Sequence, residues 1–137
     1  MGDTLGNIWV ANGRGTVTRI KCKEDSLGIR AVINQVLSIE PLRRINTLHR
    51  DKRNRIWFGM NREGLGYIDP DSSIHLIKMP PVFNNQPIRC LEEDEAGYLW
   101  VGTGGGIARM EFYQNLAAPD WHNYQSVRTC SNVFLLT

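Results

Sequence analysis

Residues 94–109 have the sequence DEAGYLWVGTGGGIAR, a strand-like run followed by a run of glycines. A glycine loop that binds phosphate leads into a helix, because the helix N-terminus supplies free N–H groups and a positive dipole end. Here the residues after the glycines alternate and carry no helix cap, while YLWVGT before them is aromatic and β-branched. The stretch therefore predicts two strands joined by a glycine turn, and it predicts no phosphate site.

The same pattern occurs three times along the chain. In each copy an aspartate stands six residues before a tryptophan, with a glycine or asparagine midway and apolar residues on both sides of the tryptophan. Glycine and asparagine tolerate a positive φ, so each copy predicts a tight turn between antiparallel strands. The three copies contain Asp3, Gly6 and Trp9, then Asp51, Asn54 and Trp57, and then Asp94, Gly97 and Trp100.

Further strand-like runs complete this unit. INTLHR (45–50) and IRCLEE (88–93) precede the second and third aspartates, and SIHLIKM (73–79) and WHNY (121–124) follow the tryptophan runs. The run GIRAVINQVLSIEPLRR (28–44) has helix spacing in part, but its density of Val and Ile favours a strand. Four short antiparallel strands in about 40 to 50 residues is the periodicity of a β-propeller blade.

We therefore expect an all-β fold, a partial β-propeller of about three blades of four-stranded antiparallel sheet. The expected repeats are 1–44 (incomplete), 45–87 and 88–130, with 131–137 starting a further blade, all in one segment, 1–137. Propellers close with about four to eight blades. The remaining blades are expected from a longer parent chain or from a second copy, in which SNVFLLT (131–137) would complete the first blade.

The charge of the chain is nearly balanced, with 16 basic and 14 acidic residues. This balance gives no basic field of the kind that attracts nucleic acid or anionic lipid. The small clusters RR (43–44) and DKRNR (51–55) are interpreted as solvated turns. No apolar run is long enough to span a bilayer, so we expect no direct membrane contact.

The cysteines and histidines are too scattered for a metal site. The cysteines are odd in number without C-x-x-C spacing, which argues against zinc and against a full disulfide framework. Cys90 lies in an alternating run and is expected as a buried free thiol. We predict no metal and no cofactor from this set, which comprises Cys22, Cys90, Cys130, His49, His75 and His122.

The unit IRCLEEDEAGYLWVGTGGGIARMEF (88–112) resembles the repeat of the two-component regulator propeller family, the sensor region of bacterial hybrid histidine kinases. The resemblance covers nearly the whole chain and is strongest in the third unit. It implies a periplasmic propeller that senses carbohydrate or related ligands and signals to a histidine kinase. None of the kinase is expected in this chain, so the resemblance implies a binding module and not an enzyme.

Polar residues of the inner strands and of the links are the expected ligand site, because these line the channel mouth of a propeller. Asn46 is among the polar residues of the first such strand. Arginine offers forked donors to a carboxylate, a sulfate or a sugar diol. The alternative, that each position is an ordinary solvated residue, stays open. The candidates are His49, Arg50, Asn61, Arg62, Arg89 and Glu92.

The repeated aspartates and tryptophans have a structural and a functional interpretation. The tryptophans could stack on sugar rings, but their apolar neighbours favour packing between blades. The aspartates could form a carboxylate cluster, but separate blades hold them apart, and a turn aspartate that accepts backbone N–H bonds accounts for all three. Trp121 lies outside the repeat and is a better candidate for a ligand contact. No nucleophile has a partnered base, so no catalytic residue is predicted.

Two other functions stay open. Streptogramin lyases have a similar D-x-x-G-x-I-W-F repeat, and DKRNRIWFGMNREGLGYIDPDSSI (51–74) resembles their blades. Such an enzyme needs a general base and a metal site at the channel mouth, where this chain offers scattered histidines. Magnesium-dependent ring opening of the antibiotic would separate the two functions. A protein-interaction propeller is the third possibility, because fold does not determine function.

Overall fold

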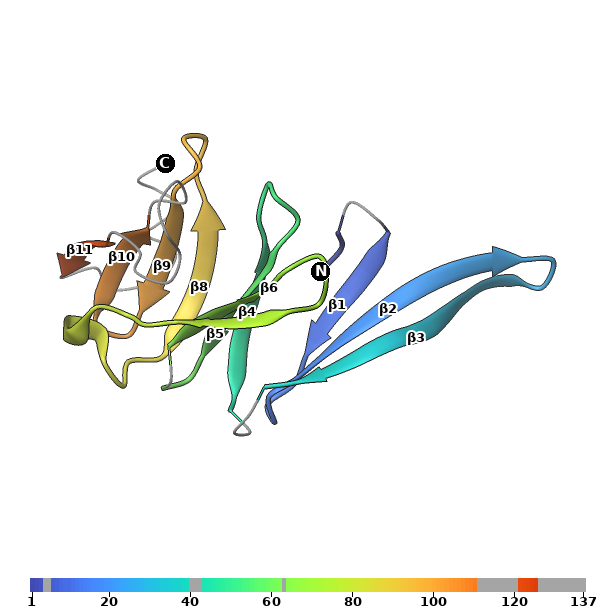
Figure 1. The fold of residues 1–137 in the computed structure, drawn as a ribbon, viewed down its shortest axis with the longest axis horizontal. Coiled ribbons are helices and arrows are strands. Elements are labelled where there is room, and N and C mark those ends of the chain that lie inside the picture. The colour runs from blue at the N-terminus through green and yellow to red at the C-terminus, as the bar shows by residue number, and fades with distance from the viewer. Residues whose placement is uncertain (4–5, 40–42, 63, 111–120, 126–137) are drawn as a thin grey trace.

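The computed structural model describes residues 1–3, 6–39, 43–62, 64–110 and 121–125, whose strands form three antiparallel sheets side by side (Figure 1). The first sheet contains β1 (Asn7–Ala11), β2 (Thr16–Asp25) and β3 (Gly28–Ser38). The second contains β4 (Ile45–Arg50), β5 (Ile56–Met60), β6 (Leu65–Ile68) and β7 (Ile74–Ile77). The third contains β8 (Ile88–Glu93), β9 (Leu99–Thr103), β10 (Gly106–Met110) and β11 (Trp121–Gln125), and a 3₁₀ helix, η1 (Pro81–Phe83), lies between β7 and β8.

The all-β prediction is confirmed, because the described elements are strands apart from the short helix η1. Consecutive strands are neighbours in every sheet, as in propeller blades. The run over 28–38 is a strand, as its Val and Ile content indicates. The described part of the first sheet has three strands where a complete blade has four, and the segment 131–137 lies outside the described residues. The limits of the repeats stay a prediction.

The turns depend on residues that accept a positive φ. In the three aspartate turns φ is 79° at Gly6, 64° at Asn54 and 89° at Gly97. The glycines of the opening stretch form a hairpin, in which Thr103 at the end of β9 pairs with Gly106 at the start of β10. Thr103 Oγ1 donates to the Gly106 carbonyl over 2.8 Å. The glycines therefore turn one strand into the next.

The core lies between the sheets. Trp9 and Val17 of the first sheet pack against Ile56 and Phe58 of the second. Trp57, Tyr67 and Leu65 of the second sheet pack in the same cluster as Leu99 and Val101 of the third. The middle sheet is covered on both sides, and every residue of β5 and β6 is buried.

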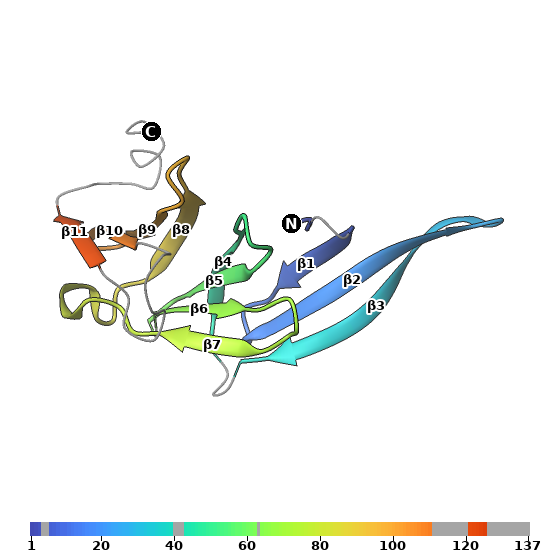
Figure 2. The ribbon, with the colours of Figure 1, turned by 45° about the horizontal axis from the view of Figure 1, so that its top comes forward.

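Within the described part of the chain, the first sheet is covered on one side only. In β1, Asn7 and Trp9 are buried while Ile8 and Val10 are exposed, so burial alternates along the strand. Beyond β1, strands β2 and β3 continue as a two-stranded arm, which projects from the sheet (Figure 2). One face of this sheet thus carries apolar side chains that no described residue covers.

The cysteines differ from the expectation at one position. Cys22 on β2 is exposed and free. Cys90 on β8 is only partly buried and is disulfide-bonded, so the expected buried free thiol is wrong. Strand alternation reports which face a side chain occupies, but it carries no information about a bonding partner. Cys130 lies outside the described residues.

Candidate functional site

Each aspartate turn is held by the same set of hydrogen bonds, which we call the Asp–Trp clasp. One carboxylate oxygen accepts the backbone N–H four residues on, and the other accepts the indole N–H six residues on. The indole bond is 2.8 Å long in all three repeats. The backbone bonds join Asp3 to Asn7 (2.9 Å), Asp51 to Arg55 (2.9 Å) and Asp94 to Tyr98 (3.0 Å). The constant spacing of six residues was the sequence signal for the indole bond, which sequence reasoning missed.

The middle clasp also holds a buried arginine. Arg55 Nε donates to Asp51 Oδ2 over 2.6 Å, and the guanidinium carbon lies 5.5 Å from the centroid of Trp57. Both charged groups are buried, so the interpretation of 51–55 as a wholly solvated turn is wrong for Arg55. A buried ion pair stabilises the fold only if its geometry is good enough to offset the cost of removing both charges from water. The carboxylate of Asp51 is therefore occupied by structural contacts.

The third clasp shifts the ionisation of its aspartate. Burial would raise the pKa of Asp94, but hydrogen bonds from Trp100 and from the backbone of Tyr98, Ala96 and Gly97 outweigh it and hold that pKa below its usual value. The three aspartates belong to separate turns, and no group of three His, Cys, Asp or Glu side chains among the described residues could hold a metal ion. The clasps are thus turn-forming units.

The predicted ligand residues are divided between the two ends of the sheets. Strands β4 and β8 run side by side, so their first residues share one end and the aspartate turns that follow them share the other (Figures 1 and 2). Asn61 and Arg89 line one hollow at the first end. Arg62 lines another, beside Lys78. His49 and Glu92 interact electrostatically nearer the turn end.

The hollow that contains Asn61 and Arg89 measures about 350 Å³, and we call it the Arg44–Arg89 hollow. Asn46 Nδ2 donates to the Ile88 carbonyl over 3.1 Å and to Asn61 Oδ1 over 3.4 Å. The backbone N–H of Asn61 donates to the Arg44 carbonyl over 2.9 Å. Residues of two adjacent sheets therefore form one polar surface, lined by Arg44, Asn46, Asn61, Pro87 and Arg89.

A second hollow of about 630 Å³ adjoins this surface at Arg44 and is lined by Asn12, Gly13 and Arg14 of the β1–β2 link. Sequence reasoning missed Arg44, which it placed in a solvated turn. The available signal was its position one residue before an inner strand.

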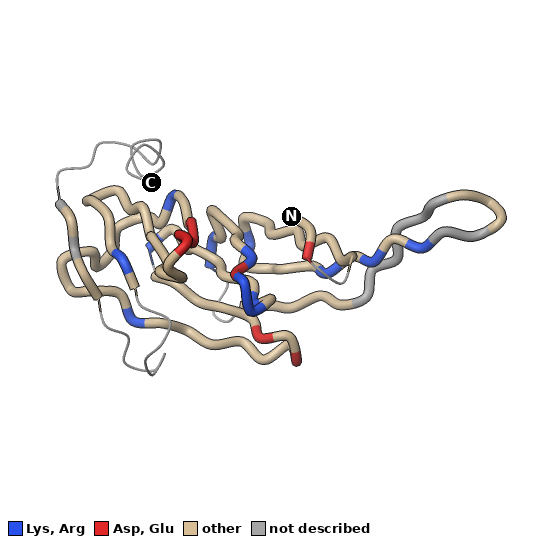
Figure 3. The backbone as a smooth tube through the Cα atoms, turned by 90° about the horizontal axis from the view of Figure 1, so that it is seen from above, with Lys and Arg blue, Asp and Glu red and all other residues tan. Residues whose placement is uncertain are grey.

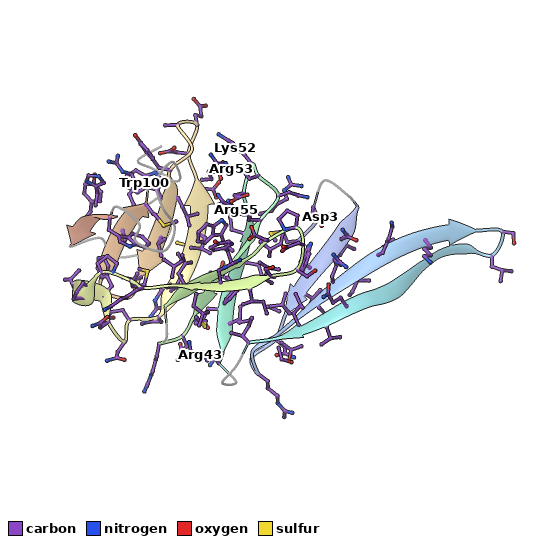
Figure 4. The ribbon with its side chains drawn as sticks, viewed as in Figure 1. Asp3, Arg43, Lys52, Arg53, Arg55 and Trp100 are labelled. Atoms are coloured by element: carbon purple, nitrogen blue, oxygen red, sulfur yellow. The ribbon has the colours of Figure 1, made fainter. Side chains whose placement is uncertain are left out.

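At the turn end, Lys52 of the second sheet contacts residues of the third sheet and its aspartate turn (Figure 4). Lys52 Nζ lies 3.7 Å from Glu93 Oε1 and donates to the carbonyls of Asp94 and Glu95 over 3.1 and 3.3 Å. Figure 3 views the molecule from this end and shows acidic and basic residues on it. Lys52 of the second sheet is therefore already engaged with a carboxylate and two carbonyls of the third sheet and its aspartate turn.

His49 lies on β4 and is partly buried. Burial lowers the pKa of its imidazole, and the carboxylates of Glu92, Glu93 and Asp51 oppose that shift. Its Nε2 is buried and has no hydrogen-bond partner in the described part of the chain. Trp121, the other candidate for a contact, packs against the core between the second and third sheets.

Residues 82–105, which cover the start of the third sheet, match the family model described as "Two component regulator propeller". The chain carries a two component regulator propeller repeat. No curated protein matches the chain. In the part of the chain that the structure describes, no helix has the length and apolar character to cross a membrane.

Among solved structures, the chain is similar to virginiamycin B lyase from Staphylococcus aureus, a β-propeller, with a TM-score of 0.67 and 17% identity. The similarity covers 91% of this chain and 39% of that chain. The chain thus spans well under half the length of this structural relative. An identity this low shows the fold, which is a propeller, and leaves function open.

Proposed function

We propose that the chain is a ligand-sensing propeller segment of a bacterial two-component regulatory system, which binds an extracytoplasmic ligand in the periplasm without catalysis. The match of residues 82–105 to the two component regulator propeller repeat is the observation that carries this proposal. The proposed ligand is a carbohydrate. No cofactor and no nucleic acid enter the proposal.

The Arg44–Arg89 hollow supports a ligand site at the first end of the sheets. It lies between two blades at the ends of their inner strands, which in a propeller line the mouth of the central channel, and its volume of about 350 Å³ suits a small molecule. Asn46 and Asn61 present amides that can donate to and accept from sugar hydroxyls. The hydrogen bonds of Asn46 already fix its amide before a ligand arrives.

The test is calorimetric titration of the 137-residue chain with a panel of neutral and acidic oligosaccharides. We expect binding of at least one member, weakened by Asn61→Ala. Arg53→Gln serves as the control, because Arg53 is exposed at the turn end, away from the hollow (Figure 4). Binding of no saccharide, or binding that Asn61→Ala leaves unchanged, would contradict the proposal.

We further propose that the exposed face of β1 docks on another blade of the same repeat. Ile8 and Val10 are exposed there, whereas Ile56 and Phe58, their counterparts on β5, are buried against the neighbouring sheet. In the second sheet the corresponding face is therefore covered by a neighbouring blade. In a solution of this chain, the covering blade comes from a second copy.

The structural relative favours a second candidate function. Its name describes a lyase acting on virginiamycin B, and its fold matches this chain at a TM-score of 0.67. The described histidines, His49, His75 and His122, lie on three different strands. Incubation of the chain with virginiamycin B and Mg²⁺ separates the two candidates. Ring opening would support the lyase function, and an unchanged antibiotic is the result expected of a sensor.

A further inference from the structure

We infer that the Arg44–Arg89 hollow binds an oxyanion of the ligand, a carboxylate or a sulfate, through the guanidinium groups of Arg44 and Arg89. This inference rests on the proposed function, because it names the chemistry of the ligand that the same site takes. It adds an anion-binding role for Arg44, a residue that sequence reasoning did not place in the site.

The local charge carries the inference. Arg44 and Arg89 line the hollow, Arg14 lines the adjoining one, and no carboxylate is among the described residues that line either. The chain as a whole has 16 basic and 14 acidic residues, so this local excess of positive charge does not follow from composition. Guanidinium groups bind planar or tetrahedral oxyanions with two parallel N–H donors.

Two cations of the turn end, Arg55 and Lys52, are already occupied. Arg55 is paired with Asp51 over 2.6 Å, and Lys52 contacts Glu93 and two backbone carbonyls. Neither Arg44 nor Arg89 forms an ion pair with a carboxylate of the described residues. The guanidinium groups of Arg44 and Arg89 are therefore available to an incoming anion.

The backbone beneath the two arginines is fixed. Ile45 and Ile88, the neighbours of Arg44 and Arg89, are buried in the cores between the sheets. The Arg44 carbonyl accepts from Asn61, and the Ile88 carbonyl accepts from Asn46. Because the anchors are rigid while the guanidinium groups are exposed, binding an anion orders the side chains alone.

The two adjoining hollows leave room for a ligand longer than one sugar unit. The Arg44–Arg89 hollow, at about 350 Å³, is at the lower end of the volumes of small-molecule sites. The neighbouring hollow of about 630 Å³ shares Arg44 and reaches the β1–β2 link. A ligand of two or three sugar units would place its anionic group at Arg44, which the two hollows share, and extend into either hollow.

The experiment compares charged and neutral ligands of equal size on the 137-residue chain. Uronate-containing and sulfated disaccharides, neutral disaccharides and inorganic sulfate are titrated at low ionic strength. We expect an acidic disaccharide to bind more tightly than the neutral ones, and Arg44→Gln and Arg89→Gln each to weaken it about tenfold, as loss of a charge-assisted hydrogen bond predicts. Arg53→Gln removes the same charge at the turn end and should change nothing.

The outcomes separate this inference from the proposed function. A neutral disaccharide that binds as tightly as the acidic ones, with no effect of Arg89→Gln, overturns the inference and leaves the sensor function in place. Sulfate binding that depends on Arg44 without any saccharide binding supports the anion site and contradicts the carbohydrate ligand. Binding of no probe overturns both. Circular dichroism of each variant confirms that it is folded.

Discussion

Strands β5 and β1 occupy the same position of the repeat, yet their surroundings differ. In β5, Ile56 is 1% and Phe58 0% exposed, whereas their counterparts in β1, Ile8 and Val10, are 40% and 47% exposed. The tryptophan between each pair is buried in both strands. Among the described residues, the second sheet has a neighbour on both faces, and the first has one on its tryptophan side alone.

Burial of these strands therefore depends on the neighbouring blade and not on the strand itself. Both strands have apolar residues on both faces, which suits a strand packed between two sheets. A strand with one solvated face usually alternates apolar and polar residues. The sequence of β1 therefore matches the environment of β5, and its exposed face is incomplete without a covering blade.

The largest difference is expected between Phe58→Ala and Val10→Ala. Phe58 is fully buried between two sheets, so its truncation should cost about 3–5 kcal/mol of unfolding free energy. Val10 is exposed, and Val10→Ala should cost no more than about 0.5 kcal/mol at a dilution where the chain is monomeric. Urea unfolding followed by circular dichroism measures both. Equal losses would mean that the two strands are equally covered.

The clasps extend the comparison to buried charge. Asp51→Ala leaves the buried Arg55 guanidinium unpaired, and we expect a loss of about 3–5 kcal/mol. Asp3→Ala removes the same indole and backbone bonds from a partly buried clasp, at about 1–3 kcal/mol. Thermal unfolding compares the two. A larger loss for Asp3→Ala would contradict the view that the buried Arg55 makes the middle clasp the costlier one to break.

Gly59 on β5 tests the close approach of two blades. A Cβ at this position would meet the side chains of Ile88 on β8 and Thr47 on β4, so Gly59→Ala should cost about 1–3 kcal/mol. Gly13 is the control, because a Cβ there meets no atom within 4 Å. A chain as stable with Gly59→Ala as with Gly13→Ala would show that the second and third sheets lie farther apart.

The smallest expected effect is that of pH on His49. Burial lowers the pKa of His49 in the folded chain. Below pH 6.5, the usual pKa of a histidine, the unfolded chain therefore binds a proton more readily than the folded chain does. Stability should therefore be fully present above that value and should fall as pH drops toward the folded-state pKa. His49→Gln should flatten this part of the pH profile of unfolding. An unchanged profile would show that His49 does not titrate differently on folding.

The sequence predicted the sheets well because their signals are local. The Asp-to-Trp spacing, the positive-φ residues Gly6 and Gly97, and the alternation of 88–93 each act within a few residues. The ligand residues stay a prediction, and which of them lie together could not be read from the sequence, because a hollow depends on which strand ends meet. Sequence reasoning grouped His49 with Arg89, whereas the structure places Arg89 with Arg44 across two sheets.

The most direct test of the central claim is the solution mass of the 137-residue chain, measured by light scattering over a range of concentrations together with Val10→Asp. We predict a mass above that of the monomer that rises with concentration, and a shift to the monomer in Val10→Asp with an unchanged circular dichroism spectrum. A chain that is monomeric at every concentration, and indistinguishable from the variant, would contradict the claim that the exposed face of β1 docks on another blade.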